Sequence, residues 1–227
     1  MTNDDLRLDV AAELSWDPRL DSRAIAVSAD DGAVTLRGMV GSFREKREAE
    51  KAAARVYGVT DISNELQVQL LDGSKRDDTA VRGDVLQALR LDRLVPTTVD
   101  AKVLGGFVTL TGTAQWQYQR DEAEFLAASV RGVFGIQNDI TLTSTSDGRD
   151  IKAAISDAFR RGARLDADEL SVDTTSHGAV ILAGAVSSWA EHDEAVAAVW
   201  SAPGVTEVDD RIVVEYWDRS TVAGNGD

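Results

Sequence analysis

The sequence predicts an α+β protein of three tandem small αββαβ domains, each with two helices packed on one face of a three-stranded mixed sheet. One seven-residue pattern carries most of this prediction, because apolar helical stripes and alternating strands recur around it in the same register. The pattern occurs as GAVTLRG at 32–38, GFVTLTG at 106–112 and GAVILAG at 178–184.

The spacing of the copies sets the size of each domain. A Gly-Val pair follows every pattern at the same distance, at 58–59, 132–133 and 204–205. Solenoid repeats span only about 20–50 residues, so copies this far apart indicate tandem domains. The domains are placed at 4–71, 77–144 and 148–217. Residues 218–227 are expected to form a disordered tail.

Each domain is expected to begin with an amphipathic helix. Apolar residues recur every four positions at the start of each copy, as one face of a helix requires. They are Leu6, Val10 and Leu14, then Val81, Val85 and Leu89, and finally Ile151, Ile155 and Phe159. Pro18 and Pro96 prevent the first two helices from continuing. Gly162 is expected to end the third.

A β-hairpin is expected after each first helix. Its turn carries DDG at 30–32, GG at 105–106 and SHG at 176–178, which suit positive φ angles. The second strand of the hairpin alternates, with Val34, Leu36 and Val40 on one face of the first copy. A period of two is typical of a half-buried strand.

A second helix and a last strand complete each copy. The helix has a stripe of small apolar residues, such as Ala49, Ala52 and Ala53, that would let it lie close to the sheet. SFRE at 42–45 and SWAE at 188–191 are capping-box sequences, whereas the second copy has QWQY. Nine repeated glycines are expected to be structural: Gly32, Gly38, Gly58, Gly106, Gly112, Gly132, Gly178, Gly184 and Gly204.

The composition excludes several classes of site. The 227 residues carry a net charge of −15 and include no cysteine, so disulfides, zinc–thiolate sites and thiol nucleophiles are excluded. The two histidines lack the spacing of metal ligands, and no phosphate-loop or serine-nucleophile motif is present. We therefore expect no enzyme, and no catalytic, cofactor or metal residue.

The charge and the termini bear on partners and location. A surface this acidic repels phosphate backbones at long range, so nucleic acid is not an expected partner. The N-terminus MTNDDLRLDV resembles no secretory signal, and the longest apolar run, AVILAGAV, is too short to span a bilayer. A cytoplasmic protein is expected.

The repeated residues resemble the BON domain, named for bacterial OsmY and nodulation proteins. The resemblance rests on the glycine-bounded pattern, the alanine-striped helix, the Gly-Val pair and Asn64 or Asn138 before the last strand. The third copy departs from it with Ile181 and Asp210. The resemblance implies a non-enzymatic bacterial protein of osmotic or envelope stress. Its relatives are proposed to bind phospholipid or to tether proteins, and one cytoplasmic relative binds potassium.

Two functions follow as hypotheses. The first is a binding or scaffolding module for a phospholipid or protein partner. The alternative is a cytosolic sensor of a potassium-like monovalent cation or a small ligand, with a site at Asn64, Asn138 and Asp210. The same side chains would otherwise satisfy backbone groups of the preceding loop, as buried polar groups usually do.

A protein partner or self-association is expected from the third domain. Ile181 and Val213 are apolar on the strand face that points away from the helices. A strand that is apolar on both faces is usually covered on both. We therefore expect a neighbouring domain or a second chain to cover this face, with Trp200, Tyr216 and Trp217 extending the contact.

Aromatic residues mark the start of the second helix in every copy. They are Phe43, Trp116 and Trp189, and the second is shifted by one position. Packing as a hydrophobic staple at the helix entry is one reading. Insertion into a membrane interface is the other.

Overall fold

The computed structural model describes residues 2–69, 76–143, 148–161, 170–175 and 178–215. Several features of the sequence predictions lie outside these ranges: Gly162, the first two residues of the turn at 176–178, Tyr216, Trp217 and the tail at 218–227.

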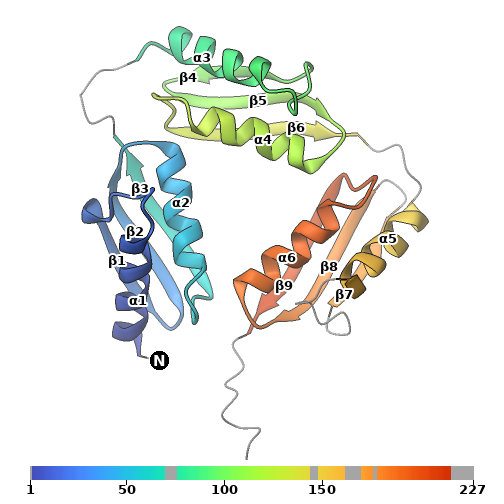
Figure 1. Cartoon of the computed structure of the whole chain (residues 1–227), viewed down its shortest axis with the longest axis horizontal. Helices are drawn as coiled ribbons and strands as arrows, with labels where there is room; N and C mark the ends of the chain where they lie inside the picture. Colours follow the sequence, from blue (N-terminus) through green and yellow to red (C-terminus); the bar gives the residue numbers. More distant parts are fainter. Residues whose placement is uncertain (1, 70–75, 144–147, 162–169, 176–177, 216–227) are drawn as a thin grey trace, which may run out of the picture.

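The three domains share one order of elements (Figure 1). The first contains α1 (Asn3–Trp16), β1 (Ile25–Asp30), β2 (Ala33–Val40), α2 (Phe43–Ala54) and β3 (Asp61–Val68). The second contains α3 (Asp78–Leu91), β4 (Asp100–Leu104), β5 (Phe107–Ala114), α4 (Gln117–Ala128) and β6 (Gly135–Leu142). The third contains α5 (Gly148–Arg161), β7 (Leu170–Thr174), β8 (Ala179–Val186), α6 (Trp189–Trp200) and β9 (Glu207–Val214).

Each sheet is mixed, as the sequence predicted. In the first domain β1 pairs antiparallel with β2, and β3 pairs parallel with β2 on its other side. The second and third domains repeat this order. A parallel pair needs a crossover connection, and the second helix supplies it. The predicted αββαβ fold is confirmed.

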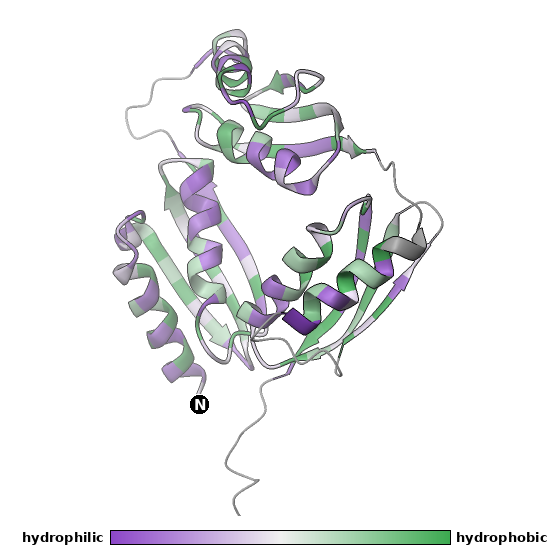
Figure 2. Ribbon diagram, turned by 45° about the vertical axis from the view of Figure 1, so that its right-hand side comes forward, coloured by the Kyte–Doolittle hydropathy of each residue, from purple (hydrophilic) through white to green (hydrophobic). Residues whose placement is uncertain are grey.

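The predicted apolar stripes form a separate core in each domain. Leu6, Val10 and Leu14 of α1 pack with Leu36 of β2 and with the alanines of α2. Figure 2 shows the apolar segments along the strands and a largely polar α2. The alanine side chains at 49, 52 and 53 are fully buried, so the small stripe lets α2 lie against the sheet.

Gly38 shows why the repeated pattern ends in glycine. Its φ of +133° is a conformation that L side chains rarely adopt. A Cβ at this position would also overlap the backbone carbonyl oxygen of Ala24. Gly112 repeats both features against Thr98, with a φ of +131°.

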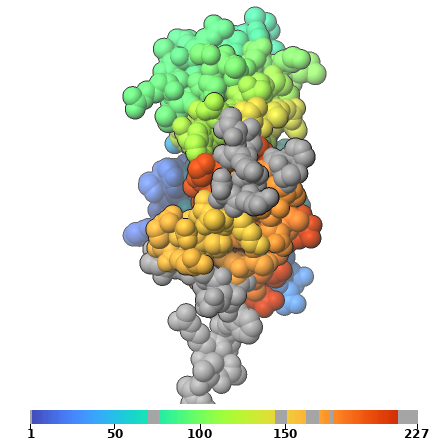
Figure 3. Space-filling model, turned by 90° about the vertical axis from the view of Figure 1, so that its right-hand side faces the viewer, coloured from blue at the N-terminus to red at the C-terminus, as the bar shows by residue number. Residues whose placement is uncertain are grey.

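The second helices are turned inward. In Figure 1, α2, α4 and α6 each face the other two domains, whereas α1, α3 and α5 lie on the outside. Figure 3 shows the third domain, in orange and red, directly against the second, in green. The domains therefore meet on their helix sides, and the open sheet faces point outward.

The expectation that a neighbouring domain covers the third sheet is wrong. Val213 remains 54% exposed within the chain. In the sheet register Ile181 lies between Asp173 of β7 and Asp209 of β9. Charged side chains therefore flank the apolar surface that Ile181 presents. Trp200 does not extend this face, because it ends α6 on the opposite side of the sheet. Cover by a second chain stays a prediction.

Within the described ranges, every helix is too short or too polar for a bilayer crossing.

Candidate functional site

A polar clasp ties the last strand of the first domain to its second helix. The Nδ2 group of Asn64 donates to the carbonyl oxygen of Lys46 at 2.9 Å and to Oε2 of Glu50 at 3.0 Å. Its Oδ1 accepts from the backbone N–H of Leu66 at 3.3 Å. The partners lie on α2 and β3, whereas the sequence pointed to the preceding loop. These contacts serve the fold, and an ion site at Asn64 stays a prediction.

The clasp of the second domain is linked to the first domain. Asn138 donates to the carbonyl oxygen of Arg120 at 3.1 Å and to Oε2 of Glu124 at 3.0 Å. The other carboxylate oxygen of Glu124 accepts from Nη1 of Arg47 on α2, at 2.7 Å. One glutamate therefore holds β6 with one oxygen and the neighbouring domain with the other.

The third domain builds the same clasp from different groups. Nε2 of His192 lies 2.8 Å from Oδ2 of Asp210, and its Nδ1 lies 3.3 Å from Oδ1 of Asp193. The edge of Trp189 packs against the imidazole, with 4.8 Å between ring centroids. Hydrogen bonding to Asp193 and the charge of Asp210 raise the pKa of His192 above its ordinary value. A doubly protonated ring can donate to both carboxylates, whereas a neutral ring can donate to one.

The raised pKa of His192 predicts that the stability of the third domain depends on pH. Because the folded pKa of His192 is raised, its contribution is complete below the ordinary value of 6.5. The contribution is lost as pH rises through the folded pKa. We expect the melting temperature of wild type to exceed that of His192→Gln most at acidic pH, and the gap to narrow in alkaline buffer. A gap that is equal at both pH values would show that the protonated ring is not the stabilising form.

Contacts from the start of α2 join the first two domains. The guanidinium of Arg44 lies 4.5 Å from the ring centroid of Phe125 on α4, close to the Arg47–Glu124 pair. Phe43 packs against the core of the second domain. Phe43 is therefore a contact between two domains. This role differs from both predicted ones, a hydrophobic staple at the helix entry and insertion into a membrane.

Trp200 joins the second and third domains. Its side chain packs against the core of its own domain and also against that of the second domain. Trp200 was expected from the sequence beside the open sheet face, whereas its side chain lies on the helix side. The second domain is therefore in contact with both of its neighbours.

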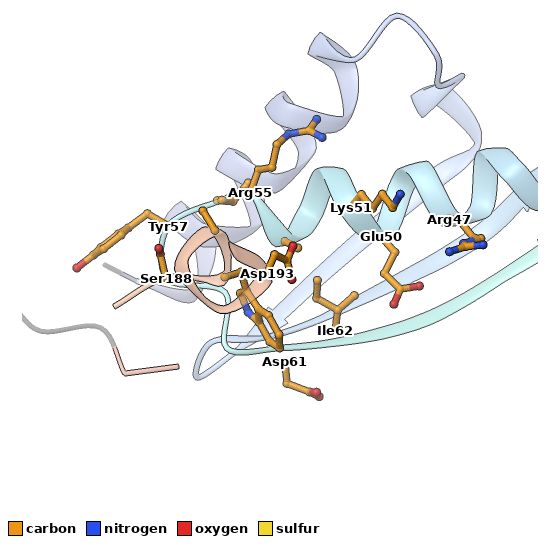
Figure 4. A pocket seen from close by; sticks show the side chains of 13 residues that line it. Arg47, Glu50, Lys51, Arg55, Tyr57, Asp61, Ile62, Ser188 and Asp193 are labelled. Atoms are coloured by element: carbon orange, nitrogen blue, oxygen red, sulfur yellow. The ribbon is translucent and has the colours of Figure 1, made fainter. Parts of the chain in front are cut away.

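A cleft of about 860 Å³ lies between the first and third domains (Figure 4). The first domain contributes the last turns of α2 and the start of β3, and the third contributes the start of α6. Basic, acidic and apolar side chains all line it. They include Arg47, Lys51, Arg55, Glu50, Asp61, Asp193, Tyr57, Ile62 and Trp189.

A network of ion pairs fixes Arg55, one of the residues that line the cleft. Arg55 binds Oε1 of Glu13 at 2.7 Å and Oδ2 of Asp17 at 3.1 Å. Arg19 binds the same buried Asp17 at 2.6 Å and also reaches Glu48. Hydrogen bonding to Arg19 holds the pKa of Asp17 far below its usual range. The network fixes the end of α2, which forms one side of the cleft.

The basic face of α2, three of whose cations line the cleft, was not identified from the sequence. Arg44, Arg47, Lys51 and Arg55 follow one another at spacings of three or four, so they share a face of α2. A basic stripe in a chain of net charge −15 was the available signal. Across the parts of the chain that the structure describes, no group of three or more His, Asp or Glu side chains is arranged to hold a metal.

Comparisons with known proteins agree with the threefold repeat. The family model "BON domain" matches residues 2–69, 77–144 and 147–216. Osmotically-inducible protein Y of Escherichia coli (strain K12) is 37% identical over 136 residues, which cover 58% of this chain and 68% of that protein.

Solved structures give weaker likenesses. CdsD, a structural protein of the type III secretion system of Chlamydia trachomatis, aligns over 93% of this chain and 92% of its own, with 15% identity and a TM-score of 0.26. The C-terminal domain of CdsD aligns over 95% of this chain and 100% of its own, with 14% identity and the same TM-score.

Proposed function

Since this chain belongs to the BON domain family, with three copies of the domain, we propose that it is a non-enzymatic binding module of osmotic stress. Its similarity to an osmotically inducible protein supports the physiological setting. The observation that carries the binding role is the cleft between the first and third domains. Its volume falls within the roughly 300–1,000 Å³ that is usual for ligand sites.

The lining of the cleft favours a protein segment as the partner. Three cationic and three acidic side chains surround it, so the net charge of the wall is close to zero. Tyr57 and Trp189 add aromatic surface, which is enriched where proteins bind one another. A mixed surface of this kind suits a polypeptide, which presents both charges and apolar groups together.

The overall charge counts against an anionic phospholipid surface. Anionic headgroups are repelled by a chain of net charge −15. This repulsion outweighs the attraction to any single basic stripe. We therefore expect little co-sedimentation with phosphatidylglycerol vesicles at physiological salt. Co-sedimentation of most of the protein would instead favour the lipid-binding role of the family.

Photo-crosslinking from the cleft tests the protein partner. A photoreactive amino acid at Lys51, which lines the cleft, is expected to capture defined proteins in cells grown at high osmolarity. The matched control carries the same group at Gln67, an exposed residue on the open sheet face of the same domain. The proposal predicts stress-dependent crosslinks from Lys51 and few from Gln67. Equal crosslinking from both positions would contradict a partner in the cleft.

A further inference from the structure

We infer that the contact between the first two domains is an ionic latch that opens as the salt concentration rises. The latch consists of Arg44 and Arg47 on α2 and of Glu124, Phe125 and Ser129 at the end of α4. It concerns the arrangement of the domains and stands whether or not a protein segment enters the cleft.

Charge dominates the latch. Arg47 meets Glu124 at 2.7 Å, and the two side chains are 36% and 23% exposed. Arg44 lies over the ring of Phe125 and donates from Nη1 to Oγ of Ser129 at 3.4 Å. Both attractions involve a guanidinium that solvent ions can reach. A contact of this kind is weakened by salt much more than a buried apolar core is.

Apart from the latch, few apolar side chains join the first two domains between α2 and α4. Between α2 and α4, Phe43 is the large apolar side chain that reaches the core of the second domain. Interfaces between domains of one chain resemble transient protein–protein contacts, so relative motion is the default where the apolar area is small. The packing of Phe43 opposes separation of the two domains at every salt concentration. The attraction made by Arg44 and Arg47 is the part that weakens as salt rises.

The position of Glu124 makes the latch specific to these two domains. Asn138 holds one oxygen of Glu124, so the other oxygen is fixed in the direction of Arg47. The residue of the first domain that corresponds to Glu124 is Glu50, which Asn64 holds in the same way. Glu50 lines the cleft, so only the second copy uses its clasp to hold a neighbour in the described structure.

Opening of the latch would alter the cleft. Arg47 both pairs with Glu124 and lines the cleft toward the third domain. When Glu124 is released, the guanidinium of Arg47 is free to turn into the cleft. A rise in ionic strength, which accompanies loss of water from a cell, would thus change the domain arrangement and the charge of the cleft together.

Energy transfer between two dyes tests the latch in the full chain. The protein has no cysteine, so Gln67→Cys and Lys102→Cys give one labelling site on the open sheet face of the first domain and one on that of the second. Raising NaCl from about 0.1 M to about 1 M shortens the Debye length from roughly 10 Å to roughly 3 Å. We expect the transfer efficiency to fall over this range while the far-ultraviolet circular dichroism is unchanged. A constant efficiency would overturn the inference.

Two variants and a neutral solute separate the latch from other effects. Arg44→Gln with Arg47→Gln should give low transfer already at low salt and remove the salt response. Lys46→Gln with Lys51→Gln removes the same charge from the same helix and should keep the response. Sucrose at matched osmolality should not open the latch. Equal behaviour of the two variants, or opening by sucrose, would contradict screening of these arginines as the cause.

Discussion

Replacement of Gly38 by alanine is expected to destabilise the first domain strongly and to leave the stability of the second and third unchanged. The φ of +133° at this position is unfavourable for alanine, and its Cβ would overlap the carbonyl oxygen of Ala24. Strained backbone costs about 1–3 kcal/mol, and forcing apart packed groups costs about 1–3 kcal/mol more. A domain of some 70 residues is stable by only about 4–10 kcal/mol, so about half of its stability would be lost.

Gly83 supplies the matched control for this substitution. It lies on the exposed side of α3, and a Cβ there would meet nothing within 4 Å. Gly83→Ala is therefore expected to stabilise the second domain by about 0.5–1 kcal/mol. Hydrogen exchange followed by mass spectrometry reports each domain separately. Unchanged protection of β1 and β2 in Gly38→Ala would show that the glycine is not required there.

Replacement of Leu110 by alanine is expected to lower the stability of the second domain by about 2–5 kcal/mol. Leu110 is fully buried in that core, which also contains Val85, Val108 and Ile140, so its removal leaves a cavity there. The second domain also contacts both neighbours through Glu124 and Trp200. We therefore expect loss of the domain arrangement at the temperature where the second domain melts.

Leu104 provides the control for the core substitution. It stands at the end of β4 and is 82% exposed, so Leu104→Ala removes the same atoms from a solvated site. Its effect should lie within about 0.5 kcal/mol of wild type. Thermal unfolding and small-angle scattering of both variants would distinguish the outcomes. Similar melting temperatures for the two variants would mean that the packing of Leu110 contributes little.

The fold could be predicted because each helix and strand carries its own periodic signal. Leu6, Val10 and Leu14 are one example: their spacing fixes which side of α1 faces the core, and all three are buried. Three copies in one register removed the ambiguity that a single copy would leave. The register also placed Asn64 toward the helices, where its side chain is found.

No comparable periodic pattern in the sequence indicates how the three domains are arranged. Arg47 and Glu124 lie 77 residues apart in the sequence, and both belong to polar helix faces that ordinarily face water. The position of Phe43 at the start of α2 could be explained by a contact within its own domain, so it did not indicate a contact with the second domain. The error at Val213 came from considering the outward residues of β8 and β9 without the charged groups beside Ile181 in the assembled sheet.

Each of the three sheets has two edge strands. In each sheet the middle strand is paired on both sides, so the first and third strands are the edges. Unpaired edges are templates for strand addition, and charged side chains discourage it. The third strands carry such charges, among them Asp61, Glu65, Asp139, Glu207 and Asp209. When osmotic stress concentrates the molecules around the protein, this acidity would keep neighbouring copies from joining edge to edge into aggregates.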